Sequence, residues 1–404
     1  MIPKQVMDIT GKYVFISVAL LCISSHIDAA SFEKLIKPGH WFEVEGSHMR
    51  QVAPCGGVIR NSKNPPKCDP SKGDPSVECY NSYALKDISH IVNGWSGGAF
   101  DEKRQSLLIF GGGHKGWAGN DIYSFSLETF KWHRISDASC LTEDDIRPNM
   151  QGLRDNGYYS DNTPRSFHTY NSIQYLRNID SLCRFSGGDN RVDCYNISSN
   201  KWTQLSDIPG SGIGLISAVN PINGEVWVRT NQRASKLLFY NPRADNWKTV
   251  KSRDGSKFLY NWTAAIDPHN NLMLAVGGKR NLRATFLWNL EDPPSSIQLL
   301  NTKGDLEIEH TKNPGLQYDP TIGKFVAWRG GTDIFIFDID TLQWIKHSAD
   351  LDNRADPGNQ VKNGTYGRFR YSEKHNVYVL MNGVDSNVYL YRIDKDAIAE
   401  KLKN

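Results

Sequence analysis

One pattern recurs six times along this chain and limits what it can fold into. The copy "SLLIFGGG" followed by "NDIYSFSLETFKW" holds short apolar runs with polar alternation, split by Gly, Asn and Asp turns. Such alternation indicates antiparallel strands, and the copies recur at about 40 to 60 residues, which is the period of propeller blades. The later copies lie at 177–205, 221–250, 268–290, 320–347 and 372–393. The sequence therefore predicts an all-β propeller.

The last copy is incomplete, which predicts how the ring closes. Residues 366–393 supply three strands and no closing Trp, whereas "HWFEVEGS" (40–47) has the form of an isolated outer strand. We expect residues 40–46 to pair beside 387–393, because this pairing removes the open edges of an incomplete ring. Six blades follow from this count. A seventh blade built from the Cys- and Pro-rich stretch 48–90 is the alternative, although we interpret that stretch as a decorated loop.

Double glycines and paired aromatic residues give the repeat a family resemblance. The glycines are Gly112-Gly113, Gly187-Gly188, Gly277-Gly278 and Gly330-Gly331, and the aromatic pairs are Tyr123 with Trp132, Tyr195 with Trp202, Tyr240 with Trp247, and Phe337 with Trp344. Over residues 90–394 the pattern resembles the kelch repeat of galactose-oxidase-like propellers, and "GGGHKGWAGNDIYSFSLETFKW" is similar to a group of exported bacterial kelch proteins. The resemblance implies a kelch-type β-propeller. It implies no single function, because kelch propellers serve enzymes, adaptors and binding proteins.

The N-terminus and the cysteines indicate export. Lys4 and Lys12 precede the apolar run 13–23, and small residues follow, which is typical of a signal peptide (1–29) rather than an uncleaved anchor. We therefore expect a secreted or periplasmic domain over 30–404, with no membrane association after cleavage. Six cysteines remain, and an even number in an exported chain suggests disulfides. Cys183 and Cys194 flank a turn and are expected to pair, Cys68 with Cys79 bracket a loop, and Cys55 with Cys140 follow by elimination.

The position of the glycines predicts where a site lies. We label the strands of a blade A to D from the centre outward. The B–C loops and the D–A links then open on one face, and a glycine that ends strand B displays the residues after it. His114, His168, Arg165 and Tyr170 are the candidate catalytic residues. The candidate ligand-binding residues are Lys115, Trp117, Asn120, Arg191, Arg233, Tyr260, Arg280, Arg329, Tyr366 and Arg368.

Basic residues outnumber acids on this predicted face, so an anionic ligand is expected there. The first hypothesis is a polysaccharide lyase on uronic acids, in which Arg165 or Arg191 neutralises the carboxylate. His114 or His168 would then be the base, and Tyr170 or Tyr260 the acid. The alternative is a non-catalytic carbohydrate- or protein-binding propeller, which needs only the basic and aromatic surface. A copper radical oxidase ranks last, because its Tyr, His and Cys ligand set is not found.

The remaining expectations concern partners. The net charge of +3 is too small to predict a kind of partner. The expected partner therefore depends on where the charged residues lie. We expect an acidic polysaccharide or another anionic ligand, no nucleic acid, no cofactor and a monomer. A metal site is not expected, because no cysteine pair has the CxxC spacing typical of zinc.

Overall fold

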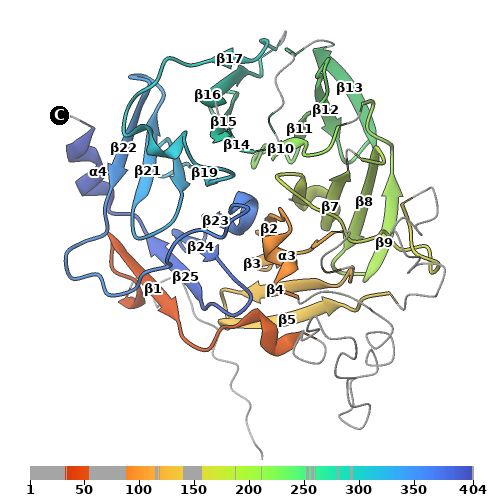
Figure 1. The fold of residues 1–404 in the computed structure, drawn as a ribbon, viewed down its shortest axis with the longest axis horizontal. Helices are drawn as coiled ribbons and strands as arrows, with labels where there is room; N and C mark the ends of the chain where they lie inside the picture. Colours follow the sequence, from red (N-terminus) through yellow and green to blue (C-terminus); the bar gives the residue numbers. More distant parts are fainter. Residues whose placement is uncertain are drawn as a thin grey trace, which may run out of the picture.

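Strands make up nearly all of the regular structure in the computed structural model of this chain (Figure 1). Among the described residues, no helix combines the length and the apolar character that crossing a bilayer requires. The predicted signal peptide and most of the predicted loop 48–90 lie outside the described residues. The structure describes residues 32, 34–53, 88–113, 117, 119–139, 157–186, 188–210, 212–251, 254–255, 259, 261–279, 282–291 and 294–402.

Six sheets form the blades, each built from consecutive antiparallel strands except where the ring closes. Blade 1 consists of β2 (Gly98–Asp101), β3 (Ser106–Ile109), β4 (Ile122–Ser126) and β5 (Lys131–Ser136). Blade 2 consists of β6 (Ile173–Leu176), β7 (Ser181–Ser186), β8 (Arg191–Asn196) and β9 (Lys201–Leu205). Blade 3 consists of β10 (Ile216–Val219), β11 (Val226–Arg229), β12 (Leu237–Asn241) and β13 (Asn246–Lys251). Blade 4 consists of β14 (Trp262–Asp267), β15 (Leu272–Lys279), β16 (Leu282–Asn289) and β17 (Gln298–Leu299). Blade 5 consists of β19 (Gly315–Asp319), β20 (Lys324–Trp328), β21 (Ile334–Asp338) and β22 (Gln343–His347). Blade 6 consists of β23 (Phe369–Ser372), β24 (Val377–Met381), β25 (Val388–Arg392) and the N-terminal strand β1 (His40–Val44).

The N-terminal strand closes the ring, as the incomplete last copy predicts. β1 pairs antiparallel with β25, from His40 opposite Arg392 to Val44 opposite Val388. Each inner strand contacts the inner strand of the next blade, and β2 of blade 1 contacts β23 of blade 6. The all-β fold, the six blades and the closing strand are therefore confirmed.

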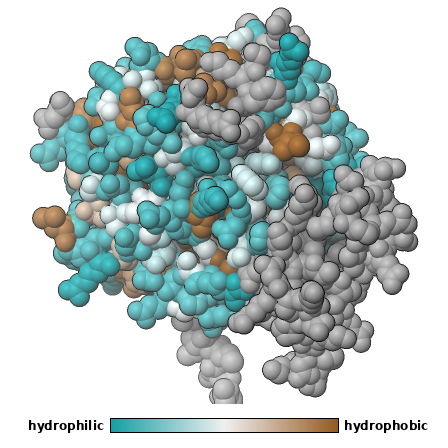
Figure 2. Space-filling view, viewed as in Figure 1, coloured by the Kyte–Doolittle hydropathy of each residue, from teal (hydrophilic) through white to brown (hydrophobic). Residues whose placement is uncertain are grey.

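Helical segments are few and short. Among the described residues, the named α-helices are α3 (His90–Asn93) and α4 (Lys395–Lys401), and the 3-10 turns are η1 (Met49–Val52), η4 (Arg177–Ile179), η5 (Leu306–Ile308) and η6 (Tyr366–Arg368). A short strand, β18 (Lys303–Gly304), runs parallel to β22 outside blade 5. On the face shown in Figure 2 hydrophilic residues predominate, and hydrophobic residues appear in small groups.

The tryptophans of the outer strands hold neighbouring blades together. Trp202 packs 5.7 Å from Phe110 of blade 1, and Trp247 packs 6.2 Å from Phe185 of blade 2, as ring-centroid distances. The Trp344 indole donates a hydrogen bond to Thr285 of blade 4. In blade 1, the register partner of Trp132 is Phe125. These large rings therefore bury apolar area between blades, which is a main stabilising term in a propeller.

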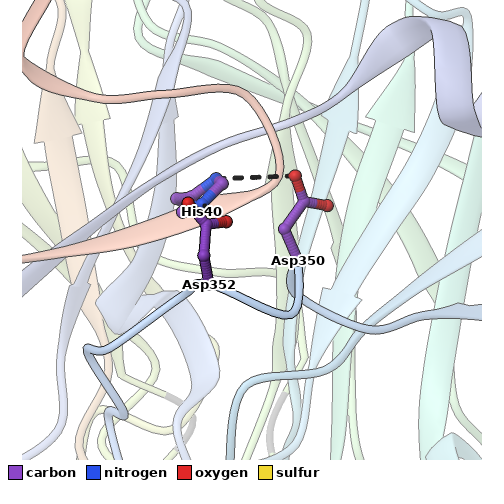
Figure 3. Close-up of side chains that lie close together, drawn as sticks. All are labelled: His40, Asp350 and Asp352. Atoms are coloured by element: carbon purple, nitrogen blue, oxygen red, sulfur yellow. Dashed lines mark hydrogen bonds and ion pairs between the residues drawn. The ribbon is translucent and has the colours of Figure 1, made fainter.

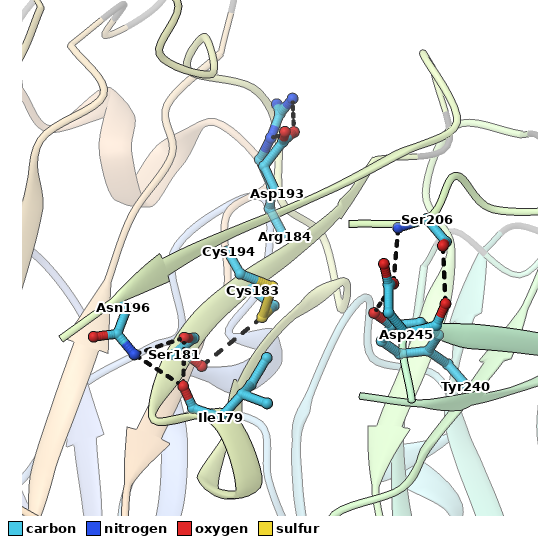
Figure 4. Close-up of a disulfide and its surroundings, with 10 residues drawn as sticks. All are labelled: Ile179, Ser181, Cys183, Arg184, Asp193, Cys194, Asn196, Ser206, Tyr240 and Asp245. Carbon is cyan, nitrogen blue, oxygen red and sulfur yellow. Dashed lines mark hydrogen bonds and ion pairs between the residues drawn. A yellow bond between two sulfur atoms is a disulfide. The ribbon is translucent and has the colours of Figure 1, made fainter. Parts of the chain in front are cut away.

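The disulfide between Cys183 and Cys194 is confirmed (Figure 4). The two cysteines are register partners on β7 and β8, so the bond links two strands that are joined by one turn. A disulfide is compatible with an extracellular or periplasmic protein. The other four expected partners, Cys55, Cys68, Cys79 and Cys140, lie outside the described residues.

The connections divide the molecule into two faces. The B–C loops and D–A links form one face, which we call the B–C face. The A–B turns and the C–D turns form the opposite one, the A–B face. Each inner strand runs from the B–C face to the A–B face, so the two ends of every inner strand mark the two mouths of the central channel.

Candidate functional site

The D–A links meet around the ring axis at the B–C face. The amide of Tyr170 donates to the Trp95 carbonyl at 2.7 Å, and the amide of Asn313 donates to the Asn261 carbonyl at 3.0 Å. Trp95, Tyr170 and Tyr366 each lie three residues before an inner strand, with φ values of 54°, 47° and 50°. This left-handed region is uncommon for bulky side chains, and such backbone conformations gather at functional sites.

Aromatic rings from these links form a continuous group, which we call the link aromatic group. The His168 ring lies 5.2 Å from Trp95 and 6.2 Å from Tyr170, between ring centroids. Tyr170 lies 6.1 Å from Tyr366 in an edge-to-face arrangement. Trp95 is 39% exposed, whereas Tyr366 is buried. The group thus has a buried base and a partly exposed aromatic surface, which suits stacking against a sugar ring or another flat ligand.

Three arginines gather beside this group, at the junction of blades 1 and 2. Arg184 forms a buried ion pair with Asp193 at 2.5 Å and lies 3.6 Å from Asp189 (Figure 4 shows the first pair). The Arg191 guanidinium lies over the Tyr158 ring, 4.3 Å from its centroid. Arg165 lies near Arg184, whose Nη1 donates to the Arg165 carbonyl at 3.2 Å. We call Arg165, Arg184 and Arg191 the arginine group.

Polar atoms in and beside the arginine group lack hydrogen-bond partners among the described residues. Within the described part of the chain, the Arg165 guanidinium makes neither a hydrogen bond nor an ion pair. Burial lowers the pKa of Arg165, and the Asp189 carboxylate only partly offsets that effect. Nε of Arg191 and Oδ2 of Asp189 are buried without a hydrogen bond to any described residue. Buried polar atoms are normally satisfied by protein, water or an ion, so this place is suited to a polar ligand.

The structure brings together only some of the predicted site residues. Arg165, His168 and Tyr170 share one D–A link, and Arg191 lies across from that link on β8. Arg233 and Arg329 are exposed in the B–C loops of blades 3 and 5, and no contact among the described residues joins them to the arginine group. The predicted residues His114, Lys115, Tyr260 and Arg280 lie outside the described residues.

The structure corrects the placement of three predicted ligand-binding residues. Trp117 and Asn120 are each 1% exposed: the Trp117 indole donates to Asp121, and the Asn120 amide donates to Ser139, Thr163 and the Pro164 carbonyl. Arg368 is fully buried and donates to the carbonyls of Ser96, Met381 and Gly364. These side chains hold loops in place instead of facing a ligand, because their hydrogen-bond donors are bound to acceptors inside the protein.

Sequence reasoning missed Trp95, Tyr158 and Arg184 as members of this region. Trp95 could have been found, because it occupies the same position before an inner strand as Tyr170 and Tyr366 do. No comparable signal marked Arg184. It lies within β7, and only the packing of blade 2 against the link turns it toward Asp193 and Phe167.

A second polar cluster lies at the rim, where β1 closes the ring (Figure 3). His40, Asp350 and Asp352 place ligand-type atoms within 4.8 Å of one another, as a metal site would. However, the His40 ring contacts the Pro38 carbonyl at 2.8 Å through Nδ1 and Asp352 at 2.6 Å through Nε2. Lys37 adds an ion pair to Asp352 at 2.9 Å. We interpret the cluster as a clasp that fastens the closing strand to the segment after blade 5.

The clasp predicts a pH-dependent stability. Burial lowers the pKa of His40, but its hydrogen bonds to Pro38 and Asp352 outweigh this, so the pKa of His40 is raised. A raised histidine pKa stabilises the fold fully below about pH 6.5 and loses this contribution as the pH rises through the folded-state pKa. The clasp also holds the pKa of Asp352 at about 2, so its carboxylate stays charged at mildly acidic pH. We therefore expect His40→Ala to lower the melting temperature more at pH 5.5 than at pH 8.5.

Melting curves at the two pH values, with His133→Ala as a matched control, measure this effect. His133 is exposed on β5 and belongs to no clasp. An equal loss at both pH values, or a larger loss at pH 8.5, would contradict the clasp.

The fold and these contacts define a six-bladed β-propeller with a basic, aromatic surface at one mouth of its channel. No protein-family model and no curated protein matches the chain. Among solved structures, it is similar to XC5397, a gluconolactonase from Xanthomonas campestris, at 10% identity, 73% coverage of this chain, 84% of that chain and a TM-score of 0.45. It is also similar to an auxiliary nutrient binding protein from Bacteroides thetaiotaomicron, at 11% identity, 73% and 68% coverage and a TM-score of 0.45. Both likenesses are too distant to assign an activity or a ligand.

Proposed function

We propose that this chain is an exported propeller of the kelch type that binds an acidic glycan at the B–C face. The observation that carries the proposal is Arg165, a half-buried guanidinium with no hydrogen bond or ion pair among the described residues. Arginine binds carboxylate or sulfate through paired N–H donors, and a partly desolvated site strengthens such bonds. Arg191 supplies a second cation nearby, and the link aromatic group supplies a surface for stacking against the sugar.

Titration calorimetry with polygalacturonate and with its methyl-esterified form tests this proposal. The acidic polymer should bind, whereas the esterified polymer, which keeps the sugar backbone and lacks the charge, should bind much more weakly. Arg165→Ala should weaken binding about 10-fold or more, since a hydrogen bond to a charged group contributes about 1.5–3 kcal/mol. Added salt should also weaken binding, because a charged contact that is open to solvent is screened.

Arg243→Ala is the matched control variant. Arg243 is an exposed arginine in a C–D turn on the opposite face, so its loss changes the net charge equally and leaves the B–C face intact. Equal binding of the acidic and esterified polymers, or equal losses in the two variants, would overturn the proposal.

A second candidate function is β-elimination on the same acidic glycan. It is favoured by one observation: Arg165, His168 and Tyr170 lie on a single link, with the His168 and Tyr170 rings 6.2 Å apart. In that reaction Arg165 would neutralise the uronate carboxylate, His168 would take the proton beside it, and Tyr170 would protonate the leaving oxygen. Ultraviolet absorbance of unsaturated ends in the same incubations measures it, and binding without such absorbance would leave a binding protein.

A further inference from the structure

A cavity of about 250 Å³ opens at the other mouth of the channel, on the A–B face. It is lined by residues of the inner strands and by the turns that follow these strands on the A–B face. All six blades contribute, through Glu102, Gln174, Ile222, His269, Tyr318 and Arg370 among others. No residue of the link aromatic group or of the arginine group lines it.

Arg370 provides a fixed cation in the wall of this cavity. Its Nε donates to the Gly367 carbonyl at 2.9 Å, and its Nη2 donates to the Gly98 carbonyl at 2.6 Å and to Gln174 at 3.3 Å. Gln174 in turn donates to the Ser217 carbonyl, so the layer joins blades 6, 1, 2 and 3. The Nη1 group makes no hydrogen bond with any described residue. Burial lowers the pKa of Arg370 to about 10, so the guanidinium keeps its charge at neutral pH.

Acidic side chains lie at the rim of the same cavity. Glu102 and Glu373 both line it, from the A–B turns of blades 1 and 6. Among the described residues, neither carboxylate forms an ion pair with Arg370 or with another cation. Burial raises the pKa of Glu102 to about 7, although the side chain also reaches water. One cation and two acids thus share a small cavity in which Arg370 and Glu102 attract each other without forming a direct ion pair.

Part of the remaining wall is aliphatic, beside the polar side chains of Gln174, Gln317 and His269. β14 contributes Ala264, Ala265 and Ile266, and the turn after β10 contributes Pro221 and Ile222. Such a surface can receive an aliphatic group, whereas the separated charges can receive a carboxylate and an ammonium group. A simple anion would be repelled by the two glutamates. A neutral sugar would remove water from Arg370 and from the glutamates without giving either kind of charge an oppositely charged partner.

We infer that this cavity binds a small zwitterion, an α-amino acid with an aliphatic side chain. Its carboxylate binds Arg370, its ammonium group binds Glu102 at the rim, and its side chain packs against the aliphatic wall on β14. Glu373 adds negative charge beside the ammonium group. This ligand would bind Nη1 of Arg370, which has no hydrogen bond to a described residue, and the Glu102 carboxylate together, which neither an amine nor an anion achieves alone.

Titration calorimetry with three probes tests the inference: L-leucine, L-leucinamide, which lacks the carboxylate, and N-acetyl-L-leucine, which lacks the ammonium charge. Leucine should bind, and each analogue should bind about 10-fold more weakly or worse, because each loses one charged hydrogen bond. Absence of binding by leucine at millimolar concentration would overturn the inference, as would equal binding of all three probes or of a neutral sugar.

Substitution at the rim separates the roles of the two charges. Glu102→Gln keeps the shape of an exposed side chain, so it should leave folding intact, weaken leucine about 10-fold and leave N-acetyl-leucine unchanged. Glu291→Gln, an exposed glutamate on the same face outside the cavity, should change neither affinity. Equal loss for leucine and N-acetyl-leucine in Glu102→Gln would contradict the assigned contact. Arg165→Ala should keep leucine binding, so failure of the glycan proposal and failure of this one are distinguishable.

Discussion

Asp254→Ala should destabilise this propeller by about 3–5 kcal/mol, the usual loss when one partner of a buried ion pair is removed. The Asp254 carboxylate accepts hydrogen bonds from Arg229 at 3.0 Å, from the Trp288 indole at 2.9 Å and from the Ile297 amide at 2.8 Å. The side chains of Arg229 and Asp254 are both fully buried. The variant leaves the Arg229 charge buried without this carboxylate, and it breaks a junction between blades 3 and 4.

Chemical denaturation of three variants measures this loss. Asp207→Ala, an exposed aspartate in the link between blades 2 and 3, should change the free energy of unfolding by only about 0.5 kcal/mol or less. The double variant Arg229→Met with Asp254→Ala should lose less than the single Asp254→Ala variant, because the buried charge is removed with its partner. If Asp254→Ala were as stable as Asp207→Ala, the junction would contribute little.

Trp41→Ala should cost a similar amount, about 3–5 kcal/mol, by loosening the closing strand. Trp41 is 4% exposed, its indole donates to the Thr332 carbonyl at 2.9 Å, and its ring lies 4.9 Å from Tyr391 and 6.4 Å from Trp328. It therefore fastens β1 to blades 5 and 6 together. A loosened β1 would uncover the edge of β25, and an uncovered edge favours pairing with another molecule.

Unfolding free energies and size-exclusion profiles read out both consequences. Trp95→Ala makes the same chemical change at a residue that is 39% exposed, so it should cost far less stability and should not promote association. Equal stability losses in the two variants, with no association in Trp41→Ala, would show that the ring does not depend on this closure.

The sequence by itself determined the architecture, because the responsible signals are local. Period-two alternation specifies strands, glycines specify turns, and an outer Trp in each of four copies specifies contacts between blades. Even the long-range pairing of β1 with β25 followed from a local defect, the missing fourth strand of the last copy. The pairing of Cys183 with Cys194 followed likewise from one intervening turn.

The tertiary structure alone decided which charged residues are buried with their hydrogen-bond donors bound to protein. Arg165 and Arg368 both lie in D–A links, yet Arg368 is buried with its donors bound to three carbonyls, whereas the Arg165 guanidinium forms no hydrogen bond with any described residue. Trp117 likewise faces the core. The A–B cavity was invisible in the sequence, because Glu102 and Arg370 become neighbours only when ring closure brings blades 1 and 6 together. Burial and closure depend on contacts between distant segments, and a local pattern carries no record of them.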